Sequence, residues 1–310
     1  MRLKEIIIGT RTSNLALWQA NFVKGELEKK YPNIKVTLKK TLTKGDKILD
    51  APLSKIGGKG LFTKELEDAI LKGEVDFAVH SLKDMPTALP KGLEIATITK
   101  RYDEGDAFVS DKYESFADLP KNAKVGTSSL RRKAQLLHIR KDLKILSLRG
   151  NVETRLRKMK DEDFDAVVLA AAGLKRLGFE DKIKEIFSKD IIIPAVGQGA
   201  LAVETRENDA EIKEIVDFLN DRDTKIAATA ERAFLTRVEG GCQVPVGVYG
   251  EVLGDKLNLT GVIASLDGEK LYKKSVTADV KNAEITGGSL AEELLNMGGR
   301  EILEELGLLK

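Results

Sequence analysis

Arginine is the residue type whose placement first suggests chemistry in this sequence. The chain has 15 arginines; none falls between residues 12 and 100, and eight fall between residues 101 and 176. Four of these eight, Arg131, Arg132, Arg149 and Arg155, follow short apolar segments typical of buried strands. A guanidinium group forms paired hydrogen bonds with carboxylates and phosphates. We therefore expect a cleft that binds a small polyanion, against the alternative that these arginines cover solvated helix faces.

A carboxylate lies beside a lysine in a second candidate segment, His80-Ser81-Leu82-Lys83-Asp84-Met85-Pro86. The segment directly follows the apolar run Val75 to Val79, so it is expected at the carboxyl end of a strand, where binding crevices form. Asp84 could act there as a general acid or stabilise a developing cation. The alternative is an ordinary turn aspartate before a proline. We expect His80 to pack beneath the site rather than to bind a metal.

Two glycine-rich segments complete the candidates. The segment Lys44 to Gly60 carries several lysines but lacks the Gly-x-x-x-x-Gly-Lys-Ser/Thr order of a nucleotide P-loop. It favours a basic lid over an anionic site, with an exposed loop as the alternative. The segment Gly240-Gly241-Cys242-Gln243-Val244-Pro245 holds the single cysteine. Its thiol could be a nucleophile or an attachment point, or else an inert buried side chain.

Composition excludes several classes of protein. With one cysteine and two histidines, the chain has no internal disulfide and no Cys/His zinc cluster. Its 51 basic and 49 acidic residues give a net charge of +2, which argues against a surface wholly devoted to nucleic acid. Local RNA or DNA binding through residues 149–160 stays open. The sequence has no secretory signal and no apolar run of about 18 residues, so we expect a cytoplasmic protein outside the membrane.

The elements that must position these residues follow a strand–helix–strand rhythm, which predicts α/β units with a parallel or mixed sheet. In the first unit we expect strands at 6–8, 34–42 and 75–79, and helices with apolar positions at Leu15, Trp18, Phe22 and Leu27, and at Leu61, Phe62, Leu66, Ala69 and Ile70. In the second we expect strands at 124–127, 144–148 and 166–170, a helix capped by Ser128 or Ser129, and a helix at 152–160. Ser13 is the expected N-cap of the first helix.

Two such units in succession predict two lobes with a cleft between them. The candidate crossovers are Thr97 to Gly105 and Ile193 to Gly199, and the proline and glycines of the second suit a hinge. From about Asp221 the pattern predicts a helix, strands at 244–252, 257–264 and 271–278, and a last helix at 289–306. This order indicates a small α+β domain with an antiparallel sheet. A two-lobed anion-binding protein without enzymatic activity also fits these features.

Seven motifs in order resemble one family over essentially the whole chain. They are Gly9 to Ala16, Gly57 to Phe62, Val79 to Pro86, Gly126 to Arg132, Arg149 to Val152, Pro194 to Leu201 and Gly240 to Pro245. The sequence thereby closely resembles the porphobilinogen deaminases, also called hydroxymethylbilane synthases. The resemblance implies two lobes like the halves of periplasmic binding proteins, formed by residues 1–99 with 200–219 and by 100–199. Residues 220–310 would form the C-terminal domain that carries the cofactor cysteine.

The activity that this resemblance implies is a transfer reaction in tetrapyrrole biosynthesis. Four porphobilinogen molecules condense head to tail, each with loss of ammonia, and give linear hydroxymethylbilane. The family uses a covalent dipyrromethane primer, which it assembles from two porphobilinogen units on a cysteine that matches Cys242. The resemblance also implies a monomer that hands its product to uroporphyrinogen III synthase.

The resemblance also assigns roles to residues of this chain. Asp84 matches the catalytic aspartate. Contacts with the cofactor are expected from Cys242, Lys83, Ser129, Arg131, Arg132, Arg155 and Gly150. Contacts with the substrate are expected from Arg11, Ser13, Arg149, Arg155, Arg176, Lys55, Lys59, Phe62 and Gln198. Porphobilinogen carries an acetate and a propionate, so a cationic cleft suits it, and Asp84 would offset the positive charge left when ammonia departs.

Overall fold

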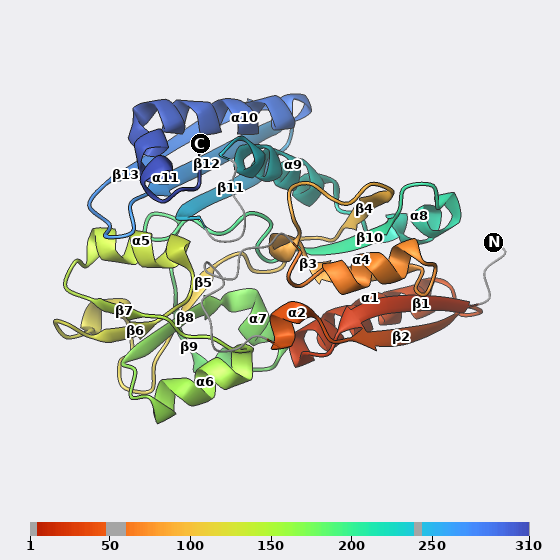
Figure 1. Ribbon diagram of the computed structural model, residues 1–310, viewed down its shortest axis with the longest axis horizontal. Helices are drawn as coiled ribbons and strands as arrows, with labels where there is room; N and C mark the ends of the chain where they lie inside the picture. Colours follow the sequence, from red (N-terminus) through yellow and green to blue (C-terminus); the bar gives the residue numbers. More distant parts are fainter. Residues whose placement is uncertain (1–4, 48–59, 239–243, 310) are drawn as a thin grey trace.

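Three sheets organise the protein. The computed structural model describes residues 5–47, 60–238 and 244–309. Two five-stranded mixed sheets form separate lobes, and a three-stranded antiparallel sheet forms the C-terminal part, drawn in blue above both lobes in Figure 1. The expected fold class, two α/β lobes with a small antiparallel α+β domain, is confirmed. Within the described ranges, no helix combines the length and apolar character needed to cross a membrane.

The first sheet has the strand order β2-β1-β3-β10-β4. Its strands are β1 (Glu5–Arg11), β2 (Lys35–Thr41), β3 (Phe77–Ser81), β4 (Leu93–Ile98) and β10 (Leu201–Arg206). Strand β1 is parallel to β2 and β3, whereas β10 is antiparallel to β3 and β4. Its helices are α1 (Asn14–Lys30), α2 (Lys44–Lys47), α4 (Lys64–Leu71) and α8 (Ala210–Val216).

The second sheet repeats this arrangement with the order β7-β6-β8-β5-β9. Its strands are β5 (Asp106–Val109), β6 (Lys124–Gly126), β7 (Lys144–Leu146), β8 (Ala166–Ala170) and β9 (Ile183–Ile186). Its helices are α5 (Leu130–Ile139), α6 (Val152–Asp161) and α7 (Ala171–Arg176). Strand β6 is parallel to β7 and β8, and β5 runs antiparallel between β8 and β9. The chain passes between the two sheets through residues 99–105 and 187–200.

Helices begin where the parallel strands end, as an open α/β sheet requires. The Ser13 side chain accepts a hydrogen bond from the Ala16 N–H at the start of α1, and Ser129 does the same for Arg132 at the start of α5. Asn151 caps α6. These side chains satisfy N–H groups that have no partner within their helix. The carboxyl ends of β1 and β6 are therefore flanked by helix N-termini that suit anionic ligands.

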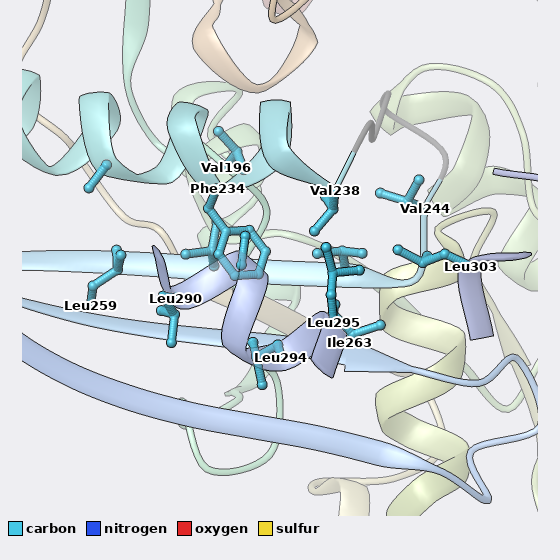
Figure 2. Packing of buried hydrophobic residues seen from close by; sticks show 14 of the residues in the cluster. Val196, Phe234, Val238, Val244, Leu259, Ile263, Leu290, Leu294, Leu295 and Leu303 are labelled. Carbon is cyan, nitrogen blue, oxygen red and sulfur yellow. The ribbon is translucent and has the colours of Figure 1, made fainter. Parts of the chain in front are cut away.

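The C-terminal part packs α9 (Arg222–Arg237) and α10 (Ala283–Leu294) on the antiparallel strands β11 (Val246–Leu253), β12 (Lys256–Ala264) and β13 (Leu271–Asp279). Its core includes Phe234, Leu259, Leu290 and Leu294, all fully or almost fully buried (Figure 2). Val196, from the second crossover, packs into the same cluster. The crossover is therefore attached to the C-terminal core as well as to the two sheets.

Three local predictions are wrong. Trp18 and Phe22 are 38% and 41% exposed and stack on each other, because the buried face of α1 is formed by Ala16, Ala20, Val23 and Leu27. Leu61 and Phe62 precede α4 rather than share its face. The last helix begins at Ala283 and is interrupted at Leu295–Gly299, where Gly298 has a φ of 123°, before α11 (Arg300–Glu305).

Candidate active site

A small pocket lies at the carboxyl ends of β1 and β3. It has a volume of about 50 Å³ and is lined by Arg11, Ser13, Leu15, Ala16, Gln19, Phe62, Thr63, Val79, His80, Ser81 and Asp84. Sequence reasoning placed Arg11, Ser13, Phe62 and Asp84 in one site, and the structure brings these four residues together. A larger pocket of about 340 Å³ lies between β13 and α10, but Glu293 is the only ionisable residue that lines it. The volume of a pocket therefore does not identify the candidate active site.

Arg11 is held by a carboxylate that sequence reasoning missed. Its Nε donates to Asp46 Oδ2 at 3.2 Å, and its NH2 group forms a short hydrogen bond with Asp46 Oδ1. The Phe62 ring covers the guanidinium, with 4.3 Å between the ring centroid and Cζ. Burial alone would raise the pKa of Asp46, but the bonds from Arg11 and Thr43 hold it below its usual value. Arg11 is thus fixed in place by an anion.

Asp84 lies in a short 3-10 turn, Leu82–Asp84, that continues β3. Its charge acts on both Lys83 and Arg155, so the three residues are electrostatically coupled across the two lobes. Desolvation lowers the pKa of Lys83 to about 8, and the charges of Arg132 and Arg131 add to that effect. Desolvation likewise lowers the pKa of Arg155 to about 10, with a contribution from Arg149. Burial and the neighbouring cations therefore disfavour the charged forms of Lys83 and Arg155, whereas the charge of Asp84 favours them.

Arg131 and Arg132 are buried, each with 5% exposure, and share one acid, Asp106. Arg131 donates to Asp106 Oδ2 at 2.6 Å and to the Ile193 carbonyl at 2.8 Å. Arg132 donates to Asp106 Oδ1 at 2.8 Å and to the Val168 carbonyl at 2.8 Å. Burial would raise the pKa of Asp106, but the two guanidinium groups hold it well below its usual range. Both guanidinium groups therefore form several of their hydrogen bonds with groups of the protein itself.

Gln198 connects this buried cluster to the catalytic candidates. Its amide nitrogen donates to the Glu104 carbonyl at 2.7 Å and to Asp106 Oδ1 at 3.1 Å. Its amide oxygen accepts a hydrogen bond from Lys83 Nζ at 3.4 Å. Gln198 thus joins the second crossover to both lobes, next to the residue that precedes Asp84.

The remaining predicted residues of the second lobe lie around the start of α6 and α5. Arg155 Nε donates to the Gly150 carbonyl at 2.8 Å. Gly150 has a φ of 123°, a conformation that side chains rarely adopt, and a Cβ there would lie 2.7 Å from Thr154 Cβ. Ser129 serves as the N-cap of α5, and Arg149 lies near enough to influence Arg155.

Arg176, at the end of α7, lies where the lobes and a crossover meet. Its NH2 group donates to the Gly199 carbonyl at 2.7 Å. Its Cζ lies 5.5 Å from the centroid of Trp18 on α1 and 5.9 Å from that of Tyr102. Desolvation lowers the pKa of Arg176 to about 10, and its Nε is buried without a hydrogen-bond partner. Although Trp18 is partly exposed, it thus contacts an arginine of the other lobe.

Three predicted site residues, Lys55, Lys59 and Cys242, lie outside the described residues. Their assigned roles stay predictions. Among the residues that the structure does describe, no group of three or more His, Cys, Asp or Glu side chains could hold a metal ion. His80 lines the pocket and its Nε2 lies 3.0 Å from the buried Glu204 carboxylate.

The basic helix α6 does not form a uniform cationic face. Arg157, Lys158 and Lys160 each pair with an acid, at 3.8, 3.4 and 3.5 Å respectively. Their partners, Asp161, Glu162 and Asp111, reduce the positive potential that a phosphate backbone would need. These ion pairs therefore weaken the hypothesis that residues 149–160 bind RNA or DNA through their positive charge.

The pocket also contains a polar residue that sequence reasoning did not select. Gln19 is 3% exposed and donates to Ser81 Oγ at 2.7 Å. The signal that could have identified Gln19 is a single polar residue on the otherwise apolar buried face of α1. For Asp106 the signal is an acid that opens the apolar run Asp106–Val109.

Comparisons with known proteins agree with this arrangement of residues. The family model "Porphobilinogen deaminase, dipyromethane cofactor binding domain" matches residues 6–214, and the model of the C-terminal domain of porphobilinogen deaminase matches residues 225–296. The porphobilinogen deaminase of Geotalea uraniireducens is 57% identical over 99% of this chain and 96% of its own length. That of Geobacter sulfurreducens is 56% identical with the same coverage.

Among solved structures, a nutrient-binding protein from Burkholderia cenocepacia covers 68% of this chain and 90% of that chain. Its sequence identity is 17% and its TM-score 0.44, a similarity too weak to bear on function. The two family models together span most of the chain, and the curated relatives match nearly all of it. The chain belongs to the porphobilinogen deaminase family.

Proposed function

We propose that this chain condenses four porphobilinogen molecules head to tail, with release of ammonia, into linear hydroxymethylbilane on a covalent dipyrromethane primer. Membership of the family supports the reaction and the primer. The observation that carries the proposal is the position of Asp84, which lines the same pocket as Arg11 and is coupled to Lys83 and Arg155. The cations of the site suit the carboxylates of the substrate, and the single carboxylate suits the cation that the substrate forms when ammonia leaves.

The cations supply binding. Porphobilinogen carries two carboxylates, so each condensation adds two negative charges to the bound chain. We propose that Arg11 and Ser13 hold the substrate from the first lobe, and that Arg149, Arg155 and Arg176 hold it from the second. Lys55, Lys59, Phe62 and Gln198 complete the proposed substrate contacts. Guanidinium groups in a partly desolvated site bind carboxylates strongly and in a fixed orientation.

Asp84 supplies the charge that the reaction itself needs. When the carbon–nitrogen bond of the substrate's aminomethyl group breaks, ammonia leaves with the electron pair and the pyrrole becomes cationic. A fixed carboxylate stabilises that cation, and it can also hold the proton of the departing amine. Arginine groups alone would raise the energy of the cation, so the acid is required among them.

The cationic residues also fit the dipyrromethane group. Lys83 and Arg155 have depressed pKa values because they are desolvated beside other cations, and the group's carboxylates would favour their charged forms. We propose that Lys83, Ser129, Arg131, Arg132, Arg155 and Gly150 hold it, and that Cys242 carries its thioether bond. When bound, the group supplies a covalent primer that keeps the growing chain on the protein.

The mass of the intact protein tests this proposal most directly. The wild-type protein from cells that make porphobilinogen should exceed its sequence mass by two pyrrole units. Cys242→Ser should lose this excess, while serine preserves the size of the side chain. An unmodified wild-type mass under these conditions contradicts the proposal and favours an anion-binding protein without enzymatic activity.

The finer parts of the proposal rest on the resemblance between sequences. We propose lobes of residues 1–99 with 200–219 and of 100–199, and a C-terminal domain of residues 220–310. We also propose a cytoplasmic monomer that delivers its product to uroporphyrinogen III synthase. Sedimentation of the purified protein tests the monomer, and a coupled assay with that synthase tests the transfer of product.

A further inference from the structure

The pairing of Arg11 with Asp46 leaves one anion-binding residue of the pocket electrically neutral. Arg11 uses its Nε and NH2 groups, one side of the guanidinium, to bind both oxygens of Asp46. Arg11 lines the pocket, whereas Asp46 does not. The acid therefore approaches Arg11 from outside the pocket, and it does not take the place of a ligand.

Asp46 is itself built to remain a fixed anion. Its Oδ2 accepts hydrogen bonds from the Thr43 hydroxyl at 2.7 Å and from the Thr43 N–H at 3.2 Å. Thr43 is fully buried, and the Asp46 side chain is 14% exposed. Burial opposes the charge, but the bonds from Arg11 and Thr43 outweigh it and lower the pKa of Asp46. This arrangement suits a permanent countercharge for Arg11.

A countercharge matters here because of what else faces the pocket. Asp84 lines the same pocket as Arg11, and the cation formed by loss of ammonia is expected beside Asp84. An uncompensated guanidinium there would attract the substrate's carboxylates but repel the cation. At an effective dielectric constant of about 20, a unit charge about 10 Å away changes a rate roughly tenfold.

We propose that Asp46 is a positioning residue that fixes Arg11 and cancels its charge, so that Arg11 binds a substrate carboxylate without destabilising the cation formed next to Asp84. This inference rests on the proposed function. It assigns to Asp46 an effect on turnover that exceeds its effect on substrate binding. A residue that merely oriented Arg11 for binding would show the reverse.

Steady-state kinetics of Asp46→Asn test the inference. The variant keeps the size of the side chain and one acceptor oxygen but removes the charge. We expect kcat to fall about tenfold while KM for porphobilinogen stays the same or decreases. Asp142→Asn is the matched control, because Asp142 also binds an arginine, Arg140, through both oxygens but lies outside the site. Unchanged kcat in Asp46→Asn, or a raised KM with kcat retained, overturns the inference.

A binding measurement separates electrostatics from damage to the fold. The probe is an amine-free analogue of porphobilinogen, with a methyl group in place of the aminomethyl group, used as a competitive ligand. It should bind more tightly to Asp46→Asn, because Arg11 then presents its full charge to the carboxylates. Weaker binding would overturn the inference, since it indicates lost orientation alone. If the wild-type protein did not condense porphobilinogen, the proposed function would fail, but the effect of Asp46 on this binding would still be measured.

Discussion

The buried carboxylate of Glu231 accepts a hydrogen bond from the Gly197 N–H at 2.7 Å and thereby ties the second crossover to helix α9. The same carboxylate accepts hydrogen bonds from Arg101 NH2 at 2.7 Å and from the Gly250 N–H at 2.9 Å. Arg101 belongs to the first crossover and Gly250 to β11. One acid of the C-terminal part thus fixes both connections between the lobes.

Glu231→Ala should lower the free energy of unfolding by about 3–5 kcal/mol, because it leaves the guanidinium of Arg101 buried without its countercharge. Urea denaturation followed by circular dichroism measures the change. Glu292→Ala is the control in the same part of the chain: Glu292 pairs with Arg237 at the surface, where an ion pair contributes about 1 kcal/mol or less. Equal losses in the two variants would show that the Glu231 contacts have no special role.

Asp106→Asn should destabilise the protein and prevent normal retention of the cofactor, because Arg131 and Arg132 lose their shared acid. The folded-state pKa of Asp106 is depressed, so its stabilising effect is present above the ordinary carboxyl pKa and is lost as the pH falls through the folded-state value. The difference in stability between wild type and Asp106→Asn should therefore be largest near neutral pH and shrink in acid. Urea midpoints across pH, with intact mass for the cofactor, measure both effects.

Asp142→Asn is the control for this experiment as well, because the Arg140–Asp142 pair lies nearer the surface. It should keep both the mass excess and nearly the wild-type midpoint. If the stability difference between wild type and Asp106→Asn grew as the pH fell, the predicted direction of the pH dependence would be wrong.

The sequence predicted which residues gather in the site better than it predicted their partners. Local patterns placed Arg131, Arg132, Arg149 and Arg155 after strand ends and Ser13 at a helix N-cap. The family resemblance was needed to assign Ser13, Ser129, Arg11 and Arg176 to the site. Asp106 was missed because its contact with Arg131 and Arg132 depends on the strand order of the second sheet, in which β5 lies beside β8. Local patterns carry no information about such neighbours.

The error in helix α1 has a similar cause. Apolar spacing placed Trp18 on the same helix face as Leu27, but Leu27 is buried together with Ala16, Ala20 and Val23, and Trp18 lies off that face. Trp18 instead lies beside Arg176 of the other lobe. A contact between lobes is created only by the tertiary arrangement, so the spacing within one helix could not reveal it.

Asp84→Asn should abolish most turnover while the protein retains its fold and its attached cofactor. The amide keeps the size of the side chain but cannot offset a cation or take up a proton, so kcat should fall about 100-fold or more. Ammonia release under saturating porphobilinogen measures kcat, while intact mass and the urea midpoint should match wild type. Turnover within a few-fold of wild type would show that another group performs the step.

The pKa of Lys83 sets how the attachment of the primer responds to alkaline pH. Because its pKa is lowered to about 8, Lys83 loses its charge as the pH rises through that value in the cofactor-free protein. The protonated form binds carboxylates, so the rate at which cofactor-free protein gains the mass of two pyrrole units from porphobilinogen should decrease above about pH 8. Lys83→Arg keeps a cation at all of these pH values and should remove the decrease. If the decrease persisted at the same pH in Lys83→Arg, it would belong to another group, and Lys83 would not control binding in this range.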